Sequence, residues 1–302
     1  MALQSAPAQK HTNNTEGMIF ILCSMMLLAI TDALVKGLGG RYSLFEIIFF
    51  RSLFAFIPLA YMIRHNGGLI SLKTNHSMFH VVRGLLGFLA LASFFVALPR
   101  MALADAIAIT FAAPFFITML SYPLLKERVG PRRWTAIVIG LIGIALIFRP
   151  GTELFVWISL GPLLSALAFA MTMILVRKYG QKESATAIAF YFTVVTLLIS
   201  ALMLPFVWLT PAIDDLLIMA VIGSFAGIAN ISMTHAFRVA EPSILAPLQY
   251  STIIFGISFG YFFWSEIPDI WMISGATIII SSGIFIIFRE AKGRAILTQI
   301  DQ

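Results

Sequence analysis

Long runs of apolar residues, separated by short polar loops, occupy almost the whole chain. Ten of these runs approach the roughly 20 apolar residues that a helix needs to cross a bilayer. They cover residues 17–37, 44–63, 78–98, 102–124, 134–148, 155–176, 185–209, 214–237, 242–264 and 270–288. The connecting loops are too short to hold a soluble domain of useful size. The pattern therefore predicts an all-α integral membrane protein with ten transmembrane helices.

Composition supports the same class. Of the 302 residues, 60% are hydrophobic and 11% are Asp, Glu, Lys or Arg, whereas soluble domains are about 45–50% apolar and about 25% charged. A soluble protein of this size would lack a charged shell. The single cysteine, Cys23, excludes a disulfide framework. The apolar surplus is expected to face lipid.

The basic residues predict an orientation. With ten spans both ends of the chain share one side of the membrane, and 15 of the 20 Lys and Arg residues fall in or near the loops and tails of that side. Only Arg41, Arg100 and Arg149 lie in the opposite loops. Basic loops stay in the cytoplasm, so both termini are predicted to be cytoplasmic. The net charge of +6 then reflects topology, and nucleic acid is not expected as a partner.

An internal repeat divides the chain into two halves. Residues Leu125-Lys126-Glu127-Arg128 resemble Trp264-Ser265-Glu266-Ile267, and the two glutamates are 139 positions apart. Gly143 and Gly283 match at an offset of 140 within similar apolar helices. Each copy holds five helices, and an odd number forces the second copy to insert upside down. Inverted repeats of this kind are typical of secondary transporters, with the substrate site near the midplane.

The repeat and its motifs are similar to the EamA-type members of the drug/metabolite transporter superfamily. The stretch from Arg238 to Tyr250, followed by Phe263-Trp264-Ser265-Glu266-Ile267-Pro268, resembles the ninth-helix pattern of that family. Ala112-Ala113-Pro114 has the same appearance in the first half. Segments 45–51 and 82–86 resemble the branch that contains bacterial S-adenosylmethionine and riboflavin carriers.

The resemblance implies a fold of two inverted five-helix repeats in a bacterial cytoplasmic (inner) membrane. We expect repeats at 17–148 and 149–288, with cytoplasmic tails at 1–16 and 289–302. Family members carry amino acids, nucleotide derivatives, vitamins and drugs, so the resemblance leaves the cargo open.

Two charged residues within the spans are candidates for the substrate site, because a charge in a bilayer is costly. Asp32 is a candidate proton or cation site, or a counter-ion for a cationic substrate. Alternatively it pairs with Lys36, one helical turn further on. Arg51 is a candidate for binding an anionic group such as a carboxylate, or for bracing the bundle against Asp32 or backbone carbonyls.

Uncharged polar and aromatic residues at comparable depth complete the candidate site. Amide and phenol groups flanked by aromatic rings suit a zwitterionic or ring-bearing solute, and a proline within a helix frees a backbone carbonyl. The candidates are Pro114, Phe115, Tyr191, Asn230, Gln249 and Tyr250.

Several chemistries have no sequence signal. The chain has no phosphate-binding loop and no His, Cys and carboxylate cluster with metal-ligand spacing, so neither a cofactor nor a metal is predicted. Two GxxxG patterns, at 223–227 and 256–260, are typical of close helix contact within a fold. Homodimerisation and proton or cation coupling stay open.

These observations predict a secondary transporter, not an enzyme. A small polar or zwitterionic metabolite would bind between the two halves, which expose it alternately to each side. The alternatives are a flippase for lipid or lipid-linked molecules on the same fold and a membrane enzyme acting on lipid. The membrane enzyme would need converging acid and base groups, and the sequence shows none.

Overall fold

The computed structural model describes residues 13–126, 130–148, 157–180 and 183–300. Within these ranges the chain is built almost entirely of helices. The α-helices are α1 (Asn14–Leu38), α2 (Leu44–His65), α3 (Ser77–Ala97), α4 (Leu103–Thr110), α5 (Ala113–Leu125), α6 (Pro131–Phe148), α7 (Leu160–Tyr179), α8 (Ala185–Val207), α9 (Ile213–Val239), α10 (Pro242–Leu248), α11 (Ser251–Trp264) and α12 (Ile270–Ile300). Short 3-10 turns lie at Gly68–Leu72, Leu98–Arg100 and Trp157–Ser159.

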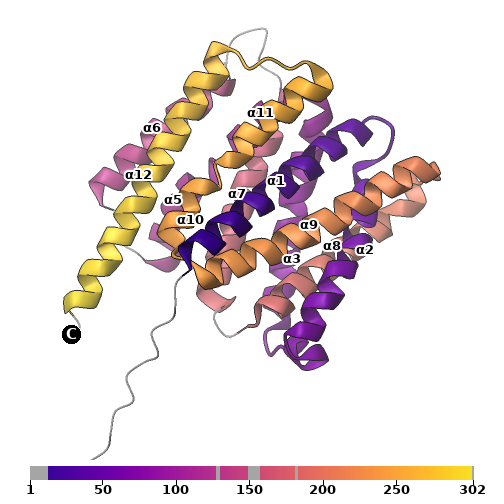
Figure 1. Ribbon diagram of the computed structural model, residues 1–302, viewed down its shortest axis with the longest axis horizontal. Helices are drawn as coiled ribbons and strands as arrows, with labels where there is room; N and C mark the ends of the chain where they lie inside the picture. Colours follow the sequence, from indigo (N-terminus) through magenta and orange to yellow (C-terminus); the bar gives the residue numbers. More distant parts are fainter. Residues whose placement is uncertain (1–12, 127–129, 149–156, 181–182, 301–302) are drawn as a thin grey trace, which may run out of the picture.

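The helices pack against one another in a single bundle (Figure 1). Nine helical segments in the described ranges are long and apolar enough to span a bilayer, and the apolar stretch Ile270–Ile286 of α12 makes the tenth crossing. Helix α1 begins and α12 ends at the same end of the bundle, which we call the terminal end. The opposite end is called the far end. The predicted all-α membrane architecture is confirmed.

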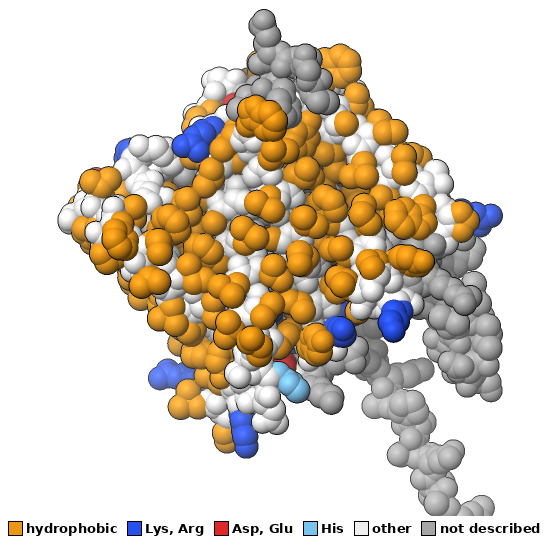
Figure 2. Space-filling model, turned by 180° about the vertical axis from the view of Figure 1, so that it is seen from behind, with side chains coloured by type: hydrophobic (Ala, Val, Ile, Leu, Met, Phe, Trp, Pro, Cys, Tyr) orange, Lys and Arg blue, Asp and Glu red, His pale blue; other side chains and the backbone are white. Residues whose placement is uncertain are grey.

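The outer surface of the bundle is apolar. Large side chains such as Ile57, Phe206 and Phe262 are 63%, 81% and 77% exposed, which would be costly in water and is favourable in lipid. Figure 2 shows hydrophobic side chains across one face, with Lys and Arg side chains near its margins. The apolar surplus in the sequence therefore covers the perimeter of the bundle.

The two halves, α1–α6 and α7–α12, pack in a symmetric pattern. When the halves are exchanged, α1 corresponds to α7 and α3 corresponds to α9. Helix α1 packs on α9, and α7 packs on α3 in the same way. Helix α2 packs on α9 as α3 packs on α8, and α1 packs on α11 as α5 packs on α7. Helices α6 and α12, the last of each half, pack on each other. Each of these contacts reappears when the halves are exchanged, as expected of two repeats.

The same repeat fixes local backbone geometry. Lys126 ends α5 and Ser265 ends α11, and these two residues have φ of 57° and 53°. They are 139 positions apart and are the non-glycine residues with positive φ in the described part of the chain. Glu266 then folds back, and its carboxylate accepts a 2.9 Å hydrogen bond from Leu103 N at the start of α4. Glu266 thus ties the end of α11 to the start of α4, whereas its repeat counterpart Glu127 lies outside the described residues.

Both GxxxG patterns lie at helix contacts inside the bundle. A side chain added at Gly223 or Gly227 would collide with α2, where Phe54 and Pro58 lie. Gly256 lies against Ile107 of α4 in the same way. The preference for contacts within the fold is confirmed, and homodimerisation stays a prediction.

Candidate functional site

The fourth and ninth crossings are broken near their middle, a feature that the hydrophobic windows did not predict. Helix α4 ends at Thr110 before α5 begins at Ala113, and α10 ends at Leu248 before α11 begins at Ser251. At both breaks the backbone forms i to i−3 hydrogen bonds, as in a 3-10 helix. Phe111 N donates to Ala108 O, and Tyr250 N donates to Pro247 O, each at 3.2 Å. Broken helices of this kind free backbone groups near the midplane, where transporters bind their substrates.

The two breaks meet through a pair of aromatic rings. Phe111 and Tyr250 are 139 positions apart, and their rings stack with centroids 4.6 Å apart at an interplanar angle of 28°. Tyr250 is 5% exposed and its hydroxyl has no hydrogen-bond partner among the described residues. Gly283 of α12 leaves room for that hydroxyl, because a side chain there would collide with it. An aromatic surface with an unused polar group therefore lies between the halves.

Two opposite charges lie on neighbouring helices in the far half of the bundle. Arg51 of α2 is buried, Asp32 of α1 is largely buried, and the two charges act on each other electrostatically. Neither side chain forms a hydrogen bond or a direct ion pair within the described part of the chain, and Arg51 Nε has no partner. A buried charge without a close partner is costly. The pair is therefore available to an external group.

The alternative pairing of Asp32 with Lys36 is wrong. The Lys36 ammonium forms an ion pair with Glu266 from the second half and donates a 2.6 Å hydrogen bond to Met101 O. It also lies 5.2 Å from the centre of the Trp264 ring. Lys36 is thus fully occupied, and it contributes no partner to Asp32.

The predicted residues of the broken crossings have two kinds of surroundings. Gln249 lies at the break itself, partly buried, and its side chain makes no hydrogen bond within the described ranges. Pro114 lies in the first turn of α5 and is also partly buried. Phe115 is fully buried, and its ring fills the space left by Gly140 of α6. Its surroundings are those of a packing residue.

The remaining two candidates lie apart from the breaks. Tyr191 is two turns from the terminal end of α8, where its hydroxyl donates to Leu72 O at 3.1 Å. Asn230 is exposed, and its amide donates to Ala226 O of its own helix at 2.8 Å. The structure does not bring these residues to Asp32 and Arg51.

Three residues at the interface between the halves were not identified as candidates from the sequence. Phe111 could have been found, because the offset of 139 pairs it directly with Tyr250. His80 and Glu183 carry no such signal, since they form an ion pair across 103 positions from different helices. Such pairs become visible only once the helices are packed.

A second polar cluster joins the two halves at the far end. Asp215 of α9 accepts bonds from the Arg41 guanidinium, at 3.0 Å to Oδ1, and from the Tyr42 hydroxyl, at 2.8 Å to Oδ2. The carboxylate that accepts this bond raises the pKa of Tyr42 above its ordinary value of 10.0. Asp215 is 7% exposed, so its carboxylate is a buried partner of these two side chains and not a solvated loop group.

The described ranges contain no group of three or more His, Cys, Asp or Glu side chains that could hold a metal ion. The candidate residues offer groups suited to binding a polar solute: one carboxylate, one guanidinium, an amide and a pair of stacked aromatic rings. Fold and site together define a class, a multi-pass membrane protein built from two helical repeats.

Comparisons with known proteins specify the class further. The sequence profile of the EamA-like transporter family matches residues 15–149 and 156–289. A protein named S-adenosylmethionine uptake transporter from Rickettsia prowazekii is 33% identical over 91% of this chain and 94% of its own length. A pseudopaline exporter from Pseudomonas aeruginosa is 28% identical over 87% and 93%. A riboflavin transporter from Rhizobium johnstonii is 26% identical over 74% and 75%.

A solved structure has the same fold, with a TM-score of 0.61 at 18% identity over 89% of this chain and 95% of that one. The chain belongs to the EamA-like transporter family. It is a membrane transporter and not an enzyme.

Proposed function

We propose that this protein is a secondary transporter for a zwitterionic, ring-bearing metabolite, which it moves by alternating access between its two halves. The carrying observation is the pair Asp32 and Arg51, a half-buried carboxylate and a buried guanidinium that form no hydrogen bond or direct ion pair in the described part of the chain. A zwitterion would supply both missing partners at once, a cationic group for the carboxylate and a carboxylate for the guanidinium. Binding would then offset the cost of keeping these charges in the membrane.

The aromatic pair supports a substrate that also carries a ring. Phe111 and Tyr250 stack between the breaks, with Gln249 next to Tyr250 in the chain, and place aromatic rings near an amide and an unpartnered hydroxyl. S-adenosylmethionine combines an amino-acid group, a sulfonium cation and an adenine ring. Several relatives at 31–33% identity are named as its uptake transporters. It is therefore the first compound to test.

The proposed setting is the bacterial cytoplasmic membrane with both termini inside. The terminal end of the bundle carries most of the basic residues, as cytoplasmic loops do. The repeats would occupy 17–148 and 149–288, between cytoplasmic tails at 1–16 and 289–302. Labelling of cysteines placed in the two sets of loops, from outside intact cells, tests this orientation.

The test of cargo is uptake of radiolabelled S-adenosylmethionine into proteoliposomes. We expect saturable uptake that falls at least tenfold in Asp32→Asn and in Arg51→Gln, because each loses a charge-assisted contact worth about 1.5–3 kcal/mol. Matched controls are Asp214→Asn, at an exposed carboxylate, and Arg64→Gln, at an exposed position of the same helix as Arg51.

Unchanged flux in both site variants would overturn the site, and absence of saturable uptake would overturn this cargo. Riboflavin and a fluorescent phospholipid serve as competing substrates in the same vesicles. Lipid movement in place of solute uptake would favour a flippase.

A further inference from the structure

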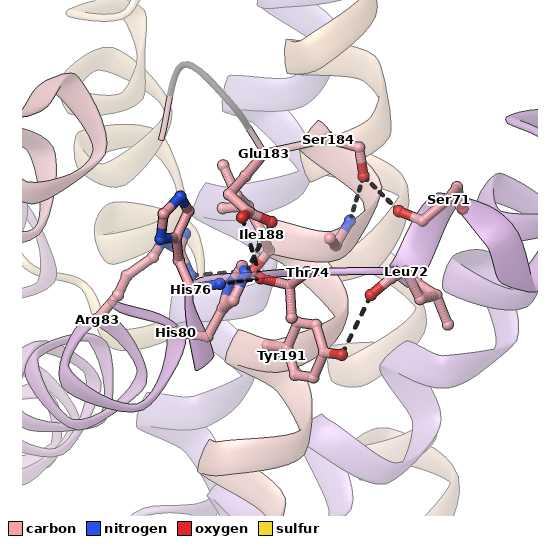
Figure 3. Close-up of polar contacts among 11 residues, drawn as sticks. Ser71, Leu72, Thr74, His76, His80, Arg83, Glu183, Ser184, Ile188 and Tyr191 are labelled. Atoms are coloured by element: carbon pink, nitrogen blue, oxygen red, sulfur yellow. Dashed lines mark hydrogen bonds and ion pairs between the residues drawn. The ribbon is translucent and has the colours of Figure 1, made fainter. Parts of the chain in front are cut away.

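A buried polar cluster joins the two halves at the terminal end (Figure 3). His80 of α3 lies 3.1 Å from Glu183, measured from Nε2 to Oε2, and their side chains are 2% and 3% exposed. Thr74 donates to the other carboxylate oxygen of Glu183 at 3.0 Å. The rings of His80 and Tyr191 lie 4.4 Å apart. We call Thr74, His80, Glu183 and Tyr191 the terminal-end lock.

Further bonds extend the same seam. Asn66 donates to the Thr186 hydroxyl at 2.9 Å, and Ser184 donates to Ser71 O at 2.6 Å. Arg83 donates to Ile188 O at 3.1 Å. Each of these bonds joins the first half to the second. The seam holds the terminal end closed in this structure.

The charged and titratable groups around His80 come from three directions. Glu183 reaches it from the turn before α8, and Tyr191 reaches it from α8. On its own side of the seam lie His76, at the start of α3, and Arg83, one turn further along (Figure 3). Nδ1 of His80 is buried without a partner in the described structure. Glu183 is therefore the group whose charge His80 contacts directly.

The far end has a cluster at the equivalent place. This cluster consists of Arg41, Tyr42 and Asp215, and we call it the far-end lock. It joins the loop between α1 and α2, the first two crossings of one half, to the first turn of α9, the third crossing of the other half. Glu183 and His80 make the same connection with the halves exchanged: a loop between α7 and α8 and the first turn of α3. In an inverted repeat, such equivalent contacts close opposite sides of the membrane.

The two locks differ in their response to pH. The far-end lock rests on an arginine, which stays charged, and on a tyrosine with a raised pKa. The terminal-end lock rests on histidine, the side chain whose charge ordinarily changes between pH 5 and 8. When His80 is protonated its bond to Glu183 is a buried ion pair, and when it is neutral that attraction is lost.

We propose that His80 and Glu183 form a proton-binding site that controls the opening of the terminal end. Protonation of His80 holds the seam shut, and loss of the proton to the solution on that side releases it. The opening of the seam therefore responds to the pH of one compartment. This inference rests on the alternating access of the proposed function, but its test does not need the cargo.

The test measures how often the seam opens. Thr186 is 1% exposed behind the bond from Asn66, so a cysteine there reacts with maleimide only when the seam separates. The reporter is Thr186→Cys in a Cys23→Ser background. Its labelling rate is divided at each pH by that of Asn75→Cys, which is exposed at the same end, so that ordinary thiol ionisation cancels.

The normalised rate is expected to rise at least threefold from pH 5.5 to pH 8. His80→Gln keeps a hydrogen-bond donor without a titrating proton, and its rate is expected to be independent of pH. The matched control is His235→Gln: His235 pairs with Glu16 at 2.8 Å at the same end, but the two side chains are 41% and 40% exposed. This control should keep the pH dependence of the parent.

A parent rate that does not change with pH, or a His80→Gln rate that still does, overturns the inference. Glu183→Gln gives a second test should His80→Gln fail to stay monodisperse, and it is expected to open more often at low pH. Labelling that follows this pattern while S-adenosylmethionine is not taken up would support the proton site and reject only the proposed cargo.

Discussion

Two charged side chains, Asp32 and Lys36, lie one helical turn apart on the far half of α1, and they differ in whether their charges have partners. Lys36 has three: the Glu266 carboxylate, Met101 O and the Trp264 ring. Asp32 faces Arg51 without a hydrogen bond or close ion pair in the described ranges. A satisfied buried charge stabilises a fold, whereas an unsatisfied one carries a cost that a ligand can remove. The first pair is a structural element, and we propose the second as part of the substrate site.

The largest expected effect concerns Asp32 and Arg51, where we expect transport to fall without a loss of stability. Asp32→Asn and Arg51→Gln should lower uptake at least tenfold, while the unfolding temperature in detergent stays the same or rises. The reason is that each change removes an uncompensated buried charge, and binding sites commonly trade stability for function. A clear fall in unfolding temperature would show that the pair braces the bundle.

The ion pair between Lys36 and Glu266 should give the reverse result, a loss of stability. Lys36→Met is expected to lower the free energy of unfolding by about 2 kcal/mol, below the 3–5 kcal/mol of a fully buried pair, because the Glu266 side chain is 23% exposed. Adding Glu266→Gln should recover much of the loss, since the amide can keep the bond to Leu103 N without its charge. Denaturant titration in detergent measures both values, and a double variant no more stable than the single one would contradict this interpretation.

The same contrast can be tested on uncharged groups. Tyr250→Phe removes a buried hydroxyl that has no partner, so we expect substrate affinity to fall about 2–10-fold with no loss of stability. Ser52→Ala removes a hydroxyl that is bonded to Thr196 at 3.0 Å. It should cost about 1 kcal/mol of stability and leave affinity unchanged. Equilibrium binding and thermal unfolding distinguish the two results.

The smallest effect concerns the far-end lock and alkaline pH. Tyr42 donates to Asp215 while its phenol is protonated, and the bond raises the pKa of that phenol above 10.0. The bond is therefore intact through neutral pH and is lost as the pH rises past the raised pKa. Ultraviolet titration of tyrosinate should show a late-titrating group that Asp215→Asn moves back toward pH 10, and that Asp214→Asn leaves in place.

Much of the architecture could be predicted because bilayers impose a simple rule on sequence. The ten apolar windows, the repeat offset of 139 and the family resemblance all hold in the structure. The breaks at Phe111 and Tyr250 were not predicted, because apolar residues continue on both sides of each break. The pairing of Asp32 with Lys36 was predicted from their spacing on one helix and is wrong, because Glu266 competes for the lysine from another helix.

The sequence by itself determined the class of the protein: hydropathy counts residues along one helix, and that is enough to place helices in a membrane and to detect a duplication. Only the tertiary structure decided which polar groups meet. Lys36 and Glu266 are 230 positions apart, and His80 and Glu183 are 103 apart. Partners at such separations are chosen by how the two halves pack, and this packing also leaves Asp32 and Arg51 without a hydrogen bond or direct ion pair in the described ranges.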